Sequence, residues 1–72
     1  MNQAEVEERL RAAVDNGVTA LSISNRCGIT PFRIRSVLVK DGEANPYRCK
    51  AVFTDAEVAS INKVLDEIKA AL

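Results

Sequence analysis

The chain has 72 residues, equal numbers of basic and acidic side chains, and 47% hydrophobic residues with one Tyr, two Phe and no Trp. This length allows one domain, residues 1–72, with one small core, and the apolar content excludes a disordered chain. The absence of His excludes Cys/His zinc sites and His-dependent catalysis, and the two cysteines form no CxxC pair. We therefore expect no metal, no cofactor, no small-molecule ligand and no enzyme activity.

The first helix is predicted over residues 3–16. Asn2 and Glu5 have the spacing of a capping box, and Asn16-Gly17 is a helix stop. The apolar residues of this stretch recur at helical spacing: Val6, Leu10, Ala13 and Val14. This first segment has neither the basic start nor the apolar run of a signal peptide, and no stretch of the chain reaches membrane-spanning length. We therefore expect a cytoplasmic protein without a membrane partner.

A helix-turn-helix is predicted over residues 20–39. A helix of poor intrinsic propensity spans about residues 19–27, and Gly28 then permits a turn with positive φ. Thr30 is placed as an N-cap, and Pro31 fits the first position of the next helix because its missing N–H leaves no helical bond unmade. We expect this third helix to span residues 31–40 and to end before Asp41-Gly42.

The last third of the chain contains one ambiguous segment and one clear helix. Residues 47–53 alternate in polarity, which leaves open a short extended segment or a strand. Residues 54–71 begin with the capping box Thr54-Asp-Ala-Glu57 and carry a long apolar stripe. The fold class predicted from these elements is an all-α bundle of about four helices.

The segment Ala20–Val39 resembles the helix-turn-helix motif of lambda-repressor and Cro-like proteins, the small regulators of phages and prophages. The turn glycine is Gly28, the small residue of the first helix is Ser24, and the apolar positions are filled by Ile23, Cys27, Ile29, Ile34 and Val37. Pro31 departs from the motif, because the family often has there a Ser or Gln that contacts a base. The resemblance covers less than a third of the chain and implies a DNA-binding transcription regulator or repressor.

The charge distribution supports a nucleic-acid partner despite the zero net charge. Residues 26–50 hold six basic and two acidic side chains, whereas both ends of the chain are acidic. On the third helix we expect double-stranded DNA to be contacted by Thr30, Phe32, Arg33, Arg35, Ser36 and Lys40. Arg35 and Ser36 are the expected centre of the reading face, Arg33 and Lys40 flank it towards phosphates, and Phe32 is left open between groove and core. Further phosphate contacts are expected from Thr19, Arg26, Arg48 and Lys50.

A homodimer is expected, because one such unit makes few base contacts. The apolar stripe of the last helix either fills its own core or forms a dimer seam, for which the expected residues are Val58, Ile61, Leu65 and Ile68. Two other functions stay open from the sequence. One is a helical protein–protein interaction module, which the zero net charge favours. The other is a non-regulatory DNA-binding factor in recombination or DNA packaging.

Overall fold

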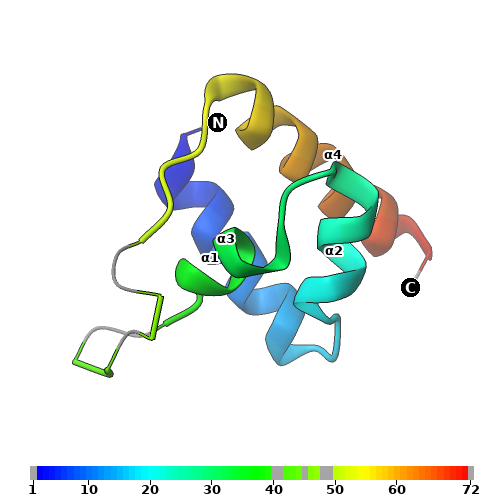
Figure 1. The fold of residues 1–72 in the computed structure, drawn as a ribbon. Helices are drawn as coiled ribbons and strands as arrows, with labels where there is room; N and C mark the ends of the chain where they lie inside the picture. Colours follow the sequence, from blue (N-terminus) through cyan, green and yellow to red (C-terminus); the bar gives the residue numbers. More distant parts are fainter. Residues whose placement is uncertain (1, 40–41, 45, 48–49, 72) are drawn as a thin grey trace.

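Four α-helices form the domain in the computed structural model, which describes residues 2–39, 42–44, 46–47 and 50–71 (Figure 1). They are α1 (Gln3–Asp15), α2 (Ala20–Cys27), α3 (Pro31–Ser36) and α4 (Asp55–Ala71). Within those described ranges there is no β-strand. The predicted all-α fold with four helices is therefore confirmed.

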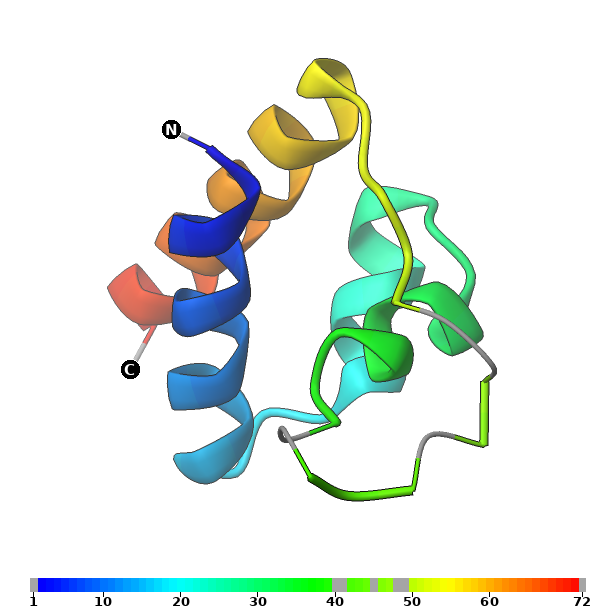
Figure 2. The same cartoon turned by 90° about the vertical axis from the view of Figure 1, so that its left-hand side faces the viewer.

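The helices are arranged around α4, which contacts both α1 and α2, while α3 packs on α2. Figure 2 shows α1 and α4 on one side of the molecule and α2 with α3 on the other. All four helices and the loops beside α3 and α4 contribute to one core: Val6, Leu10, Ile23, Ile29, Ile34, Val37, Phe53, Val58, Ile61, Val64 and Leu65. Burial of this apolar surface is the main force that holds the short helices together.

Side-chain caps set the starts of the two long helices, as the sequence predicts. Asn2 Oδ1 accepts a hydrogen bond from the backbone N–H of Glu5 at 3.0 Å. At the start of α4 the capping box is reciprocal: the Glu57 N–H donates to Thr54 Oγ1 at 3.1 Å, and the Thr54 N–H donates to Glu57 Oε1 at 2.9 Å. The predicted N-cap Asn2 and the predicted capping box of α4 are therefore confirmed.

The third helix is shorter than predicted, because α3 ends at Ser36 and not at residue 40. The N–H groups of Val37 and Leu38 bond to carbonyls three residues back, at 3.4 and 3.0 Å, which tightens the chain into turns. The Ser36 hydroxyl donates to the Arg33 carbonyl at 2.7 Å, a local bond that competes with helix continuation. Lys40 lies outside the described residues.

The segment before α4 has no strand among its described residues, although part of the predicted extended stretch 47–53 lies outside them. The Gln3 side chain takes the place of a strand partner. Its Nε2 donates to the Ala51 carbonyl and its Oε1 accepts from the Phe53 N–H, both at 2.8 Å. These bonds satisfy backbone groups that no neighbouring strand meets and hold the Phe53 ring in the core.

The α4 stripe fills the core of its own domain. Val58, Ile61 and Leu65 are 6%, 0% and 4% exposed, and Ile68 is partly buried against the same core. The prediction that these residues form a dimer seam is therefore wrong for the first three, since side chains enclosed in one domain cannot also contact a second copy. Ile68 is the one member of the predicted seam that is not buried.

Candidate nucleic-acid interface

The turn between α2 and α3 is built as the sequence predicts. Gly28 has φ of 75°, a left-handed conformation that favours glycine, and its N–H donates to the Ser24 carbonyl at 3.0 Å. The buried Ser24 hydroxyl donates to the carbonyl of Ile29, whose side chain enters the core. The turn is thus fastened from both sides, which sets the angle at which α3 leaves α2.

Thr30 and Pro31 begin α3 as predicted, but through their backbone conformation and without a side-chain cap hydrogen bond. Thr30 is extended, with φ of −61° and ψ of 145°, and Pro31 takes the first helical position. The Thr30 hydroxyl makes no cap hydrogen bond, and the Thr30 carbonyl accepts from the N–H of Arg33 at 3.1 Å. The Thr30 side chain is exposed at the start of the helix and keeps its donor and acceptor capacity for an external group.

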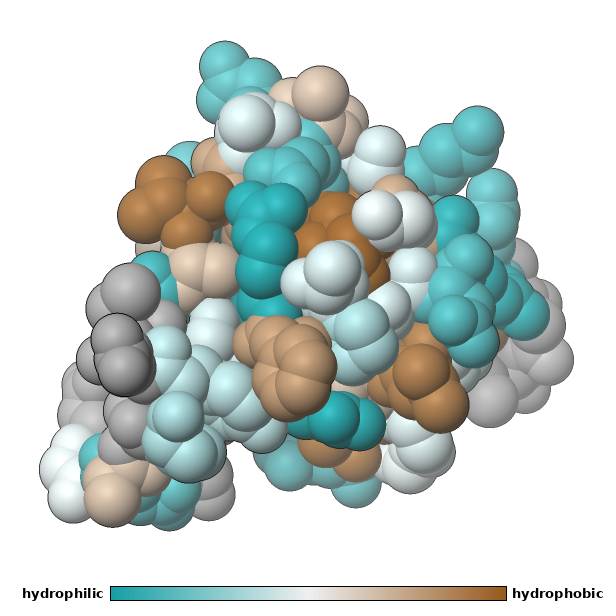
Figure 3. All heavy atoms as spheres, in the orientation of Figure 1, coloured by the Kyte–Doolittle hydropathy of each residue, from teal (hydrophilic) through white to brown (hydrophobic). Residues whose placement is uncertain are grey.

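The residues of α3 divide into an inner and an outer set. Ile34 and Ser36 are 0% and 3% exposed, whereas Phe32 is 67% exposed and Arg35 is exposed. The face seen in Figure 3, which has α3 at its front, shows apolar groups separated by hydrophilic ones rather than one continuous apolar patch. The outer face of α3 therefore combines a cation with an aromatic ring, and Phe32 is placed outside the core.

Ser36 does not belong to the outer face, and its predicted role in base reading is wrong. Its hydroxyl donates to the Arg33 carbonyl and accepts from the Ala51 N–H at 2.9 Å. Both bonds point inward and use the hydroxyl as a bridge between the end of α3 and the segment before α4. No local sequence pattern indicates this bridge, because the Ala51 N–H lies 15 residues away from Ser36.

Arg33 is partly exposed and is already engaged within the domain, so its phosphate contact stays a prediction. Its guanidinium forms a two-point ion pair with Glu57, including an Nη2–Oε1 bond of 2.8 Å, and donates to the Val52 carbonyl at 3.1 Å. The guanidinium carbon lies 5.4 Å from the centre of the Phe53 ring. The Arg33 hydrogen bond, followed by that from the Thr54 N–H, lowers the pKa of Glu57 to about 2, and the Glu57 hydrogen bond raises the pKa of Arg33.

Two further predicted phosphate contacts are engaged inside the domain. The Thr19 hydroxyl accepts from the Ser22 N–H at 3.1 Å, so it serves as the N-cap of α2. Lys50 Nζ lies 2.6 Å from Oε1 of Glu7, a carboxylate whose side chain is only 8% exposed. The buried Glu7 was missed by the sequence reading, because its helix spacing resembles that of a solvated charge. Thr19 and Lys50 are both exposed, so their phosphate contacts stay predictions.

Arg26 and Arg35 are predicted DNA contacts whose exposed cations are unpaired among the described residues. Neither forms an ion pair or side-chain hydrogen bond with any residue that the structure describes. Arg26 stands in the last turn of α2 and Arg35 in the last turn of α3. Lys40 and Arg48, the remaining predicted contacts, lie outside the described residues.

Tyr47 was missed as part of this surface. Its ring lies against Phe32, with the two ring centres 6.1 Å apart and the planes inclined by 59°. Together with Arg33, Ser36 and Ala51 the two rings line an open hollow of about 260 Å³. The alternating polarity of residues 47–53 gave the only sequence signal here, since it marked Tyr47 as an apolar side chain that needs a neighbour.

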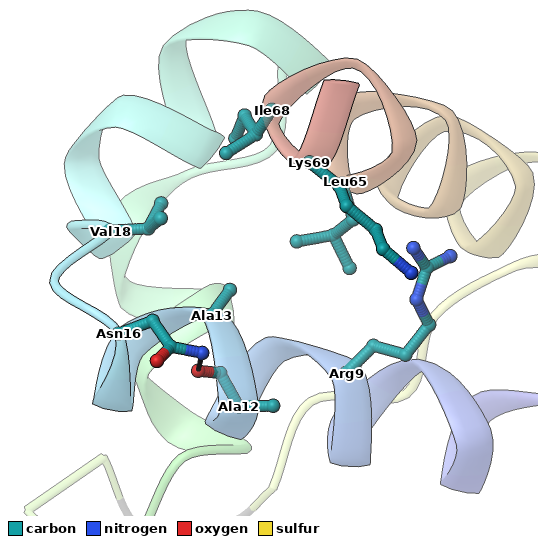
Figure 4. A pocket seen from close by; sticks show the side chains of 8 residues that line it. All are labelled: Arg9, Ala12, Ala13, Asn16, Val18, Leu65, Ile68 and Lys69. Carbon is teal, nitrogen blue, oxygen red and sulfur yellow. Dashed lines mark hydrogen bonds between the residues drawn. The ribbon is translucent and has the colours of Figure 1, made fainter. Parts of the chain in front are cut away.

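A second pocket, of about 320 Å³, lies between the ends of α1 and α4 (Figure 4). Ala13 and Val18 lie across from Leu65 and Ile68, and none of the lining residues belongs to α3. The described side chains contain no group of three or more His, Cys, Asp or Glu that could hold a metal ion. None of the helices in the described ranges has the length and apolar character needed to cross a membrane.

Comparison with known proteins found no matching family model, no similar curated protein and no similar solved structure.

Proposed function

We propose that the domain binds double-stranded DNA and presents the outer face of α3 to the major groove. The division of α3 is the observation that carries this proposal. Ile34 and Ser36 anchor the helix, while Arg35 and Phe32 project from a short unit whose entry angle is set by the Gly28 turn. Arg is the commonest reader of guanine, through two hydrogen bonds to its major-groove edge. A helix whose exposed Arg is unpaired among the described residues suits this task.

The charges of the described residues favour a DNA affinity that depends only weakly on salt concentration. Arg33 and Lys50 are paired with Glu57 and Glu7, which leaves Arg26 and Arg35 as the unpaired exposed cations among the described residues of the predicted interface. Each phosphate contact contributes about −0.9 to the slope of log affinity against log salt concentration. We therefore expect a smaller slope than the six clustered cations of the sequence suggest, and a larger share of affinity from direct contacts.

The regulatory role is the finer part of the proposal and is supported by the resemblance of residues 20–39 to phage regulators. This part of the proposal has two copies of the domain bind a symmetric DNA site, because a single α3 of six residues offers few base contacts. The dimer contact has to use a surface other than the buried stripe of α4. Ile68, which lines the pocket in Figure 4, is partly exposed at the edge of that stripe.

A protein-binding helical module is the second candidate function. The 67% exposure of Phe32 and the 50% exposure of Leu21 favour it, because exposed large apolar side chains often contact protein partners. Both candidates use the exposed Phe32 ring, so the nature of the partner separates them.

Fluorescence anisotropy with a labelled 20-base-pair duplex of random sequence tests the DNA proposal. We expect binding at 50 mM salt, loss of affinity at 200 mM salt, and at least a fivefold weaker affinity for Arg35→Ala. The matched control is Lys69→Ala, which removes an exposed cation of α4 that lines the pocket between α1 and α4, away from α3. Absence of binding at 50 mM salt, or equal losses for the two variants, contradicts the proposal.

A further inference from the structure

The ring of Phe32 is the feature of the outer face that charge does not explain. It is the second residue of α3 and is 67% exposed, so it contributes little to the core. Its contact with Tyr47 at 6.1 Å limits the directions in which the ring can point. The Phe32 ring is therefore a large apolar surface in a defined position near Arg35. Such a surface suits contact with an apolar group of the partner.

The chemistry of the major groove restricts what that group can be. Guanine, adenine and cytosine present hydrogen-bond donors and acceptors there, and the C5-methyl of thymine is the apolar group that projects from a base edge. Phe32 and Arg35 stand three residues apart, a spacing that places two side chains on one face of a helix. Two such side chains reach neighbouring base pairs.

From this arrangement we propose that Phe32, supported by Tyr47, selects a thymine methyl beside a guanine that Arg35 reads. This inference rests on the proposed DNA binding and adds its base preference. Phe32 supplies apolar contact with the methyl, and Arg35 supplies the hydrogen bonds. A pyrimidine without the methyl leaves the Phe32 ring against water or polar base edges and binds less well.

Two duplexes that differ only in methyl groups test the assignment. One is a 20-base-pair duplex of repeated TG on one strand and repeated CA on the other, and in the second duplex every thymine is replaced by uracil. We expect the wild-type protein to bind the thymine duplex about three- to fivefold more tightly, the effect of burying one methyl group. Phe32→Ala should bind both duplexes equally, whereas Phe32→Leu should keep part of the preference.

Leu21→Ala is the matched control, because it removes an exposed apolar side chain from α2 and leaves α3 intact. It should keep the wild-type preference for thymine. Thermal melting of each variant checks that the fold is retained, which the exposure of both side chains leads us to expect.

The outcomes separate this inference from the function on which it rests. Equal wild-type affinity for the two duplexes, with Arg35→Ala weakening both, overturns the role of Phe32 and leaves DNA binding in place. A thymine preference that persists in Phe32→Ala also overturns it. Failure of the wild-type protein to bind either duplex at 50 mM salt overturns both proposals and favours the protein-binding module.

Discussion

Arg33 and Glu57 join α3 to the first turn of α4 through a two-point ion pair. Glu57 at the same time completes the cap of α4 by accepting the Thr54 N–H. One carboxylate therefore determines both where α4 begins and where α3 rests. Because the Arg33 and Glu57 side chains are 38% and 23% exposed, solvent screens the pair, and its main effect is on position rather than on stability.

The ion pair should make the stability of the fold depend on pH, and removal of the Glu57 charge should abolish this dependence. The pKa of Glu57 is lowered from 4.5 to about 2, so its contribution to stability is complete above pH 4.5 and is lost as the pH falls towards 2. We expect the difference in urea midpoint between wild type and Glu57→Gln to shrink over this pH range. Glu67→Gln, an exposed change on the same helix, should follow the wild-type curve, and a constant difference for Glu57→Gln argues against the linkage.

Replacement of Gly28 should destabilise the domain through the backbone alone. A Cβ at this position meets no atom within 4 Å, so the expected cost of Gly28→Ala, about 1 kcal/mol, comes from the positive φ of 75°. Gly28→Asn is the matched variant, since Asn tolerates the left-handed region better and should lose less. Chemical denaturation of the two variants measures the difference, and equal losses contradict the strain argument.

Ser36→Ala should weaken the fold without changing base preference. The variant leaves the Ala51 N–H without its partner, which costs about 1–3 kcal/mol if water cannot reach the group. Ser60→Ala, at an exposed position of α4, should change the free energy of unfolding by less than about 0.5 kcal/mol. If Ser36→Ala keeps its stability but changes its preference among DNA sequences, Ser36 contacts bases after all.

Ile61→Ala should unfold the domain rather than separate a dimer. The side chain is fully buried, and removal of a large aliphatic group from a core costs about 2–5 kcal/mol, a large part of the stability of a small domain. Urea unfolding and sedimentation at several protein concentrations measure the two effects independently. A variant that keeps its unfolding midpoint and loses only self-association returns Ile61 to an intermolecular contact.

Local signals predicted those parts of the fold that depend on neighbours in the chain. The turn followed from Gly28 with Thr30-Pro31, and the helix starts followed from Asn2 and Thr54. Each of these features is determined by residues within four positions, which a sequence pattern can register. The end of α3 was missed because the bridge from Ser36 involves Ala51, far along the chain.

The candidate site was predicted less well, because charge spacing does not show which cation is already paired. Arg33 and Arg35 are two residues apart and equally basic, yet one is held by Glu57 and the other is free among the described residues. The same holds for the α4 stripe, whose spacing fits a core and a dimer seam alike. Only the three-dimensional positions of the acidic and apolar partners separate these alternatives.

The two hydrogen bonds that the Gln3 side chain makes with Ala51 and Phe53 affect how the domain folds. These two bonds join residues 48 and 50 positions apart, so they close residues 3–53, which include α1, α2 and α3, into one loop. Such distant contacts form late and break together, which makes folding cooperative. A fragment that keeps α2 and α3 but lacks residues 50–53 also loses the anchors of Arg33 and Ser36. The outer face of α3 therefore exists in its final form only when the first helix and the last connection have met.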